Sequence, residues 1–213
     1  MQRLLARCQL IYTKEHREII AKVLDYAMLK HKGQKRVSGE PYITHPIAVA
    51  NILLDLGMDY SSICAALLHD VLEDTDATEE ELRKLFGDTV TELVLGVTKL
   101  KKITFTSKEQ EQAENFRRMF FAMAKDIRVL IIKLADRLHN MRTVDALPRN
   151  RQEALANETL EIYARLASRL GLSYIKCEME DICLKVLHPE AYDALVKEVS
   201  LKRQERQEIV DKL

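Results

Sequence analysis

Apolar residues recur every three or four positions along almost the whole chain, the spacing that gives an α-helix one apolar face. Glycine and proline, which most often interrupt helices, number only six and four among 213 residues. Hardly any segment shows the two-residue alternation of a half-buried strand. Hydrophobic residues make up 47% of the chain, so the helices can enclose a core. The sequence therefore predicts an all-α fold, a bundle of several helices.

Apolar spacing and helix-breaking residues also predict where the helices lie. We expect one or two helices between Leu4 and Leu29, followed by a loop from His31 to Pro41. Pro46 suits the first position of the next helix, which Gly57 ends, and His45 then lies at or near its N-cap. Further helices are expected over 61–73, 78–87, 89–98, 115–123, 126–142, 152–170, 173–187 and 189–213, with a capping box at 78–81 and a loop or frayed helix start over 99–112.

Charge and cysteine usage exclude several classes of partner. Lys plus Arg equals Asp plus Glu, 33 against 33, whereas binding duplex nucleic acid through charge needs a basic face. No apolar run approaches the about 20 residues of a membrane span, and the N-terminus does not resemble a signal peptide. The cysteines show no CxxC spacing, which favours reduced thiols. We therefore expect a cytoplasmic protein with no membrane partner and no direct nucleic-acid partner.

Four ionisable residues follow the apolar run of the segment 61–74. They are His69, Asp70, Glu73 and Asp74. Their spacing of three and four residues can bring all of them to one end of a helix. Acids this close repel one another unless a cation or solvent compensates for their charge. An adjacent His-Asp pair after an apolar run suits metal ligation, although a solvated helix end has a similar pattern.

A second polar group lies in the segment 133–143. Asp136, Asn140 and Thr143 share one helix face at steps of four and three, so they can point toward a common pocket. His139 lies nearer another face, and we interpret it as a histidine at the edge of the core that bonds to a backbone carbonyl. For the lone His45, a structural role is as good an interpretation as a ligand role.

The segments are more informative together than apart. His45, His69, Asp70 and Asp136 supply two imidazoles and two carboxylates. This donor set suits an octahedral Mn²⁺ or Fe²⁺ site with water positions left over, better than a closed, cysteine-rich zinc site.

The order H…HD…D of these four residues resembles the signature of the HD phosphohydrolase superfamily. The longer segments 33–46, 65–75 and 133–143 closely resemble the N-terminal hydrolase domain of the RelA/SpoT homologue family, and the resemblance continues through 115–119 and 161–171. It implies an HD-domain multi-helix bundle over 1–196. It also implies a helical extension over 197–213 that stops about where a synthetase domain begins in longer members. Synthetase and regulatory domains of such a parent protein would be intramolecular partners.

The resemblance also implies an enzyme, a guanosine-3′,5′-bis(diphosphate) 3′-pyrophosphohydrolase of the stringent response. Its substrate would be the nucleotide (p)ppGpp, which it would cleave to GDP or GTP and pyrophosphate. The implied cofactor is Mn²⁺, and the implied site residues fall into three groups. They are the metal ligands His45, His69, Asp70 and Asp136, the catalytic residues Glu73 and Asp74, and the substrate-binding residues Arg36, Ser38, Asn140 and Thr143.

Two departures and two alternatives accompany this interpretation. Val37 and Cys177 stand where many relatives have a basic residue and a tryptophan. One alternative is an HD phosphohydrolase for another nucleotide such as NADPH, but the small animal relatives of that kind tend to have a tyrosine in place of His139. The other is a catalytically silent regulatory domain, but all four ligands and the Glu73-Asp74 pair are intact. A competent domain can also be held inactive by its neighbours in a parent protein.

Overall fold

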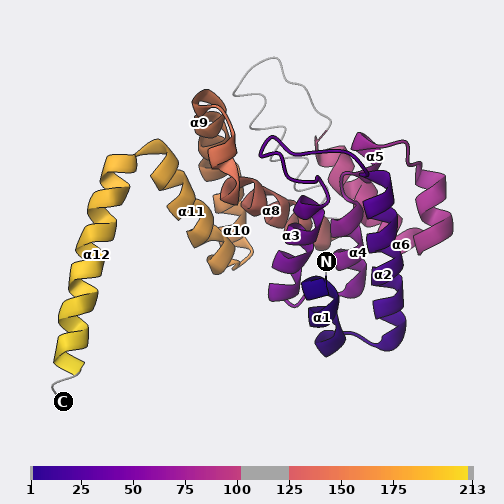
Figure 1. Ribbon diagram of the computed structural model, residues 1–213, viewed down its shortest axis with the longest axis horizontal. Helices are drawn as coiled ribbons and strands as arrows, with labels where there is room; N and C mark the ends of the chain where they lie inside the picture. Colours follow the sequence, from indigo (N-terminus) through magenta and orange to yellow (C-terminus); the bar gives the residue numbers. More distant parts are fainter. Residues whose placement is uncertain (1, 102–124, 211–213) are drawn as a thin grey trace. The chain divides into compact units, whose positions relative to one another are not determined.

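The structure, a computed structural model, describes residues 2–101 and 125–210. The chain divides into two compact units, Met1–His139 and Asn140–Leu213 (Figure 1). All regular elements assigned in the described ranges are helical, which confirms the all-α prediction. Within these ranges, Lys35 and Pro41 form an isolated antiparallel β-bridge that belongs to no strand. The helix expected over 115–123 and most of the expected loop over 99–112 lie outside the described residues.

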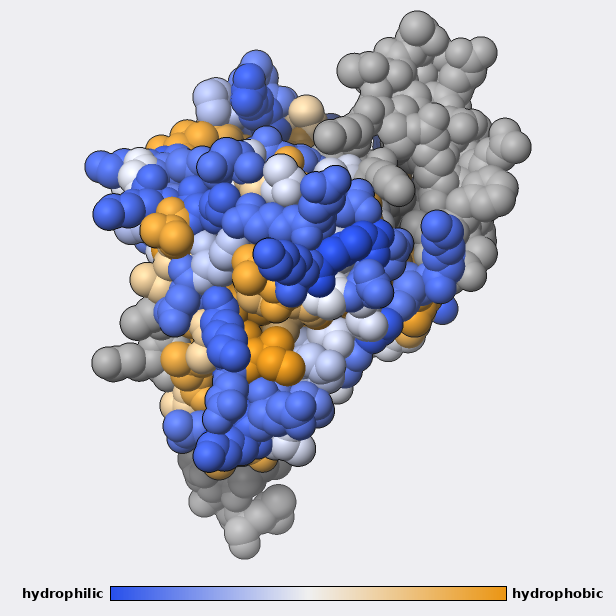
Figure 2. All heavy atoms as spheres, turned by 90° about the vertical axis from the view of Figure 1, so that its right-hand side faces the viewer, coloured by the Kyte–Doolittle hydropathy of each residue, from blue (hydrophilic) through white to orange (hydrophobic). Residues whose placement is uncertain are grey.

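The first unit is built around one buried helix. Its elements are α1 (Gln2–Ile11), α2 (Lys14–Lys30), α3 (Thr44–Asp55), α4 (Tyr60–Leu68), α5 (Val71–Asp74), α6 (Glu79–Lys101) and the larger part of α8 (Ile127–Arg142). Helix α4 packs against α2, α3 and α6, and all its residues from Ser61 to Leu68 are buried. A helix that is apolar on every side belongs in a core. On the face shown in Figure 2, hydrophilic residues predominate and hydrophobic residues form smaller groups between them.

Several expected helix ends are confirmed. Two helices, α1 and α2, occupy the segment 4–29, and α3 ends before Gly57, whose φ of +69° is the left-handed conformation that favours glycine. The Thr78 hydroxyl accepts a hydrogen bond from the Glu81 amide (3.2 Å), as expected at the start of α6. Helix α3 begins at Thr44, so His45 is its second residue rather than its cap.

The prediction of a single helix over 61–73 is wrong. Helix α4 ends at Leu68, and α5 starts at Val71. The Nδ1 atom of His69 lies 2.8 Å from the Ala66 carbonyl oxygen, which a continuing α-helix would use to accept from the Asp70 amide. This side chain competes with the backbone for an acceptor, which favours a break at this point. His69 and Asp70 therefore lie on a turn between two helices.

The second unit contains η1 (Val144–Ala146), α9 (Arg149–Glu158), the π-helical segment η2 (Thr159–Ala164), α10 (Arg165–Arg169), α11 (Ser173–Leu187) and α12 (Pro189–Val210). The helix expected over 152–170 is thus interrupted by a π-helical segment. A core cluster of this unit comprises Met141, Val144, Ala156, Cys183 and Val186. All four cysteines of the chain are free. None of the helices in the described ranges is long and apolar enough to cross a membrane.

Candidate metal centre

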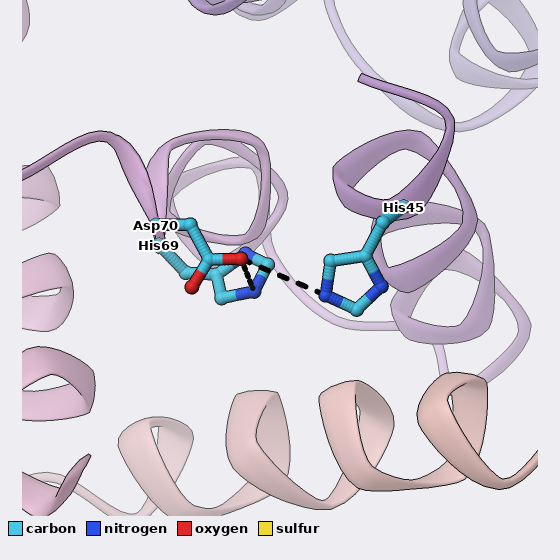
Figure 3. A group of neighbouring side chains, drawn as sticks. All are labelled: His45, His69 and Asp70. Carbon is cyan, nitrogen blue, oxygen red and sulfur yellow. Dashed lines mark ion pairs between the residues drawn. The ribbon is translucent and has the colours of Figure 1, made fainter. Parts of the chain in front are cut away.

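The four predicted ligands meet in the interior of the first unit. His45 comes from α3, His69 and Asp70 from the turn between α4 and α5, and Asp136 from α8. Their exposed fractions are 3%, 2%, 4% and 4%. Figure 3 shows the side chains of His45, His69 and Asp70 pointing toward one another. Buried charged residues are rare unless they are paired or bind a metal, so this group needs a compensating partner.

The donor atoms of the four residues lie close to one another. The Nε2 atom of His45 lies 3.2 Å from Oδ1 of Asp136 and 3.7 Å from Oδ2 of Asp70. The Nε2 atom of His69 lies 3.0 Å from Oδ2 of Asp70 and 3.9 Å from Oδ1 of Asp136. Neighbouring ligands of an octahedral ion with bonds of about 2.1 Å are about 3 Å apart. His45, His69 and Asp70 are therefore close enough together to hold one cation, and Asp136 adjoins both imidazoles of that group.

The environment of His69 provides an independent test of this fit. Its Nδ1 atom lies 2.8 Å from the Ala66 carbonyl oxygen, which can only accept, so Nδ1 carries a proton. In the neutral ring Nε2 then has a lone pair, and this buried atom faces Oδ2 of Asp70 at 3.0 Å without a partner of hydrogen-bond geometry. An imidazole held by a backbone carbonyl in this way is typical of metal-ligating histidines. The residues present therefore fit a divalent ion.

Lys133 and the two imidazoles contact different oxygens of Asp136. Its ammonium group donates to Oδ2 of Asp136 (2.6 Å), whereas Oδ1 of Asp136 faces the two imidazoles. Burial alone would raise the pKa of Asp136, but the charge of Lys133 and the nearby histidines outweigh it and hold the pKa well below its usual value. Asp136 is therefore a carboxylate at neutral pH.

The two imidazoles differ in their pKa shifts when no ion is present. Burial lowers the pKa of both rings. For His69 the charges of Asp70 and Asp136 outweigh burial, and its pKa is raised. For His45 burial prevails, and its pKa is lowered. The two carboxylates thus create a negative site that attracts a proton or a cation.

Tyr42 connects the ligand cluster to one of the predicted catalytic residues. Its hydroxyl lies 2.6 Å from Oδ2 of Asp70 and 2.8 Å from Oδ2 of Asp74. Asp74 ends the short helix α5, and Glu73 precedes it. The side chain of Gln34 also donates to the backbone oxygen of Asp74 (2.7 Å). The Tyr42 hydroxyl is therefore the group that lies between Asp74 and the predicted metal ligand Asp70 along these two contacts.

The predicted substrate residues are spread over both units. A guanidinium nitrogen of Arg36 lies 3.2 Å from Nδ1 of His139, and Ser38 is exposed in the same loop as Arg36. Asn140 and Thr143 belong to the second unit, where the Thr143 hydroxyl donates to the Asn140 backbone oxygen (3.3 Å). The substrate-binding roles of all four residues stay predictions.

Three residues at the cluster were missed by the sequence analysis as site residues: Tyr42, Lys133 and His139. The Nδ1 atom of His139 lies 2.8 Å from Nδ1 of His45, so the histidine assigned to the edge of the core instead adjoins a predicted ligand. His139 follows Asp136 by three residues, and Lys133 precedes it by three. Residues three apart share a helix face, so this spacing could have indicated that both lie near Asp136. Only the three-dimensional fold reveals the contact of Tyr42 with Asp70.

A buried H…HD…D cluster inside a helical bundle defines an HD-type domain. The sequence profile described as "HD domain" matches residues 23–173 of this chain. The chain therefore belongs to the HD domain family.

Comparison with curated proteins narrows the family further. The chain is 51% identical over 183 residues to a guanosine-3′,5′-bis(diphosphate) 3′-pyrophosphohydrolase of Haemophilus influenzae, which covers 86% of this chain and 27% of that protein. It is 52% identical over 183 residues to the bifunctional (p)ppGpp synthase/hydrolase SpoT of Escherichia coli K12, covering 86% and 26%. The chain thus spans about a quarter of the length of these curated relatives. Within the HD domain family, it is a RelA/SpoT homologue.

A solved structure agrees with this placement. It is described as a metazoan ortholog of SpoT that hydrolyzes ppGpp and plays a role in starvation responses. Its TM-score to this chain is 0.59 at 29% sequence identity, and the match covers 77% of this chain and 93% of that one.

Proposed function

We propose that this chain hydrolyses the 3′-pyrophosphate of (p)ppGpp in a Mn²⁺-dependent reaction, releasing pyrophosphate and GDP or GTP. The observation that carries the proposal is the buried set of two imidazoles and two carboxylates in a chain about half identical to a named ppGpp 3′-pyrophosphohydrolase. The proposed setting is the cytoplasm, where the reaction would remove the alarmone of the stringent response.

His45, His69, Asp70 and Asp136 are the proposed ligands of the ion. When bound, a Mn²⁺-type ion supplies Lewis acidity, which acidifies water and offsets charge on the phosphoryl group. The ligand set of nitrogen and oxygen donors, with no cysteine, suits Mn²⁺ or Fe²⁺. The ion pair between Lys133 and Asp136 leaves a single oxygen of Asp136 for the ion.

Glu73 and Asp74 are the proposed catalytic residues. A carboxylate beside the attacking water can orient it and accept its proton. Both residues follow Asp70 by about one turn, and the Tyr42 hydroxyl lies between the carboxylates of Asp70 and Asp74. Neither needs to bind the ion directly to reach the same reacting atoms.

The loop from His31 to Pro41 is the proposed site for the guanine base. Arg36 and Gly39 form a tight turn, since the Gly39 amide donates to the Arg36 oxygen (2.9 Å) and Gly39 has a φ of +84°. The turn presents Arg36, whose planar guanidinium can stack on a purine. Ser38, Asn140 and Thr143 are proposed to contact the nucleoside.

We propose that residues 1–196 form the hydrolase domain and that 197–213 are a helical extension toward further domains. The length of the curated relatives, of which this chain spans about a quarter, supports further domains. The proposed boundary at residue 196 lies inside α12 and differs from the division of the fold between His139 and Asn140. Synthetase and regulatory domains of the parent protein would then act on this site as intramolecular partners.

The decisive experiment is to incubate the purified chain with ppGpp and Mn²⁺ and to separate the products. GDP and pyrophosphate in equal amounts are expected, with no turnover in excess EDTA. NADPH is the control substrate, and phosphate release from NADPH without ppGpp cleavage would favour the other kind of HD phosphohydrolase. No reaction with either nucleotide, despite stoichiometric Mn²⁺ binding, would favour a silent regulatory domain.

A further inference from the structure

A chain of three side chains leads from the loop of Arg36 to the metal-ligand cluster. The guanidinium of Arg36 lies 3.2 Å from Nδ1 of His139, and the same Nδ1 lies 2.8 Å from Nδ1 of His45. The rings of His45 and His139 are 4.9 Å apart and tilted by 45°, so they are not stacked face to face. All three residues lie in the first unit.

The chemistry of arginine fixes the direction of these hydrogen bonds. A guanidinium only donates, so Nδ1 of His139 must be the acceptor and carry a lone pair. His45 must then donate its Nδ1 proton toward the same lone pair, which the two donors share, because two lone pairs at this distance would repel each other. In a neutral His45 the remaining nitrogen, Nε2, is unprotonated, and Nε2 is the atom 3.2 Å from Asp136.

We infer that His139 is a positioning residue that holds His45 in its metal-binding tautomer, and that Arg36 in turn fixes the acceptor state of His139. His69 reaches the same state through a backbone carbonyl, whereas His45 depends on the side chains of His139 and Arg36. The loop proposed to bind the base is thereby coupled to the affinity of the metal site. The inference rests on the proposed metal role of His45.

The inference predicts an effect of Arg36 on metal binding without any nucleotide. Removing a nearby positive charge should strengthen cation binding by Coulomb's law. Loss of the hydrogen-bond chain should weaken it, because partners of this kind typically change metal affinity about 10- to 100-fold. The two explanations therefore predict opposite changes in the Mn²⁺ affinity of Arg36→Ala: the loss of charge would raise it, and the loss of the hydrogen bonds would lower it.

The experiment is titration calorimetry of Mn²⁺ into the nucleotide-free chain at about pH 8, above the usual imidazole pKa of about 6.5. We expect His139→Leu to weaken binding about tenfold or more, and Arg36→Ala about threefold or more. His139→Asn keeps an oxygen acceptor near the position of Nδ1 and should stay within about threefold of the parent. The control is Lys32→Ala, which removes an exposed charge of the same loop and should not weaken binding. In a His139→Leu background, Arg36→Ala should have no further weakening effect.

Unchanged or tighter binding by Arg36→Ala would overturn the inference. So would an equal loss in His139→Asn and His139→Leu, because packing alone would then explain it. If the parent itself binds no Mn²⁺, the proposed function fails instead. Should His139→Leu not fold by circular dichroism, the long-range ¹H–¹⁵N spectrum of the metal-free parent decides. In that spectrum the His139 ring must carry its proton on Nε2. A proton on Nδ1 would refute the proposed hydrogen bonds from Arg36 and His45 to His139.

Discussion

At the scale of single residues, Asp136 is a proposed metal ligand whose pKa is held well below its usual value. Lys133 and the two imidazoles keep it ionised although it is buried. Asp136→Ala removes one ligand and leaves the Lys133 ammonium beside the site, where it repels a cation. We expect the variant to bind no Mn²⁺ and to lose ppGpp hydrolysis, while its helical circular-dichroism signal largely persists. Metal analysis after gel filtration measures the first effect.

The matched control for Asp136→Ala is Asp145→Ala. Asp145 is an exposed carboxylate of the second unit that also pairs with a lysine, Lys185. The control should keep about one ion per chain and full activity. A metal content that Asp136→Ala does not reduce would remove Asp136 from the ligand set.

Glu73 and Asp74 allow metal binding and catalysis to be separated. Glu73→Gln and Asp74→Asn keep the size of the side chains, but an amide cannot accept a proton at neutral pH. We expect both variants to bind Mn²⁺ and ppGpp in calorimetry. At least one should have a kcat reduced about a hundredfold or more, since general-base help is typically worth about 10²–10⁴ in rate.

Asp76→Asn is the control for this pair, because Asp76 is an exposed acid two residues further along that pairs with Lys30. It should turn over like the parent. Parent-like turnover in both test variants would make the pair a solvated helix end. Loss of metal in both would place them in the coordination shell.

Arg36 offers a test of base recognition. Stacking on an aromatic ring is worth on the order of 1–3 kcal/mol in single-strand binders. Arg36→Ala should therefore raise the KM for ppGpp about tenfold or more when Mn²⁺ is saturating. Arg36→Lys keeps the charge without the planar group and should recover only part of the loss. Steady-state kinetics with unchanged KM in Arg36→Ala would exclude the stacking role.

At the scale of elements, Asp59 joins the start of α4 to α8. It accepts a hydrogen bond from the Ser62 amide (3.0 Å) as N-cap and forms an ion pair with Arg128 (2.6 Å). Asp59→Ala should lower the free energy of unfolding by about 1–2 kcal/mol, the usual cost of losing an N-cap. Asp59→Asn keeps the cap and should lose less than about 1 kcal/mol. Urea denaturation at neutral pH measures both.

The pH dependence of this pair has a defined sign. Burial alone would raise the pKa of Asp59, but the hydrogen bonds from Ser62 and the charge of Arg128 outweigh it and lower the pKa. A lowered folded-state pKa stabilises the protein above the unfolded value of about 3.9 and ceases to do so as the pH falls through the folded value. The deficit of Asp59→Asn should shrink in that acidic range. A deficit that grows there would contradict the assignment.

The elements also show how far sequence reasoning reaches. Apolar spacing and caps such as Gly57 and Thr78 predict most helices, because these signals are local. The break at His69 was missed because it depends on a side chain that competes for a backbone carbonyl. The ligand residues could be chosen by type and order, but the contacts of Tyr42 and His139 join distant segments, which spacing alone does not reveal.

At the scale of the whole molecule, all four proposed ligands lie in the first unit, on three separate parts of the chain. An ion that binds only the folded state stabilises it by about 2.7 kcal/mol at a hundred times its Kd. In hydrogen exchange this corresponds to an about hundredfold slowing of amides that exchange through opening of the whole unit. We expect that slowing in α3 and α4, whose packing would have to open to release the ion.

The second unit has a core of its own, built from residues such as Met141, Ala156 and Cys183. If it opens separately, Mn²⁺ should leave exchange in α9 and α11 unchanged, which mass spectrometry of peptic fragments can resolve. Asp136→Ala is the control, since Mn²⁺ should then slow exchange nowhere. Equal slowing in α9 and α11 would mean that the two units open together, so that ion binding stabilises the whole chain. Absence of slowing in α3 and α4 of the parent would contradict the metal site itself, because ligands drawn from separate elements cannot hold an ion without holding those elements together.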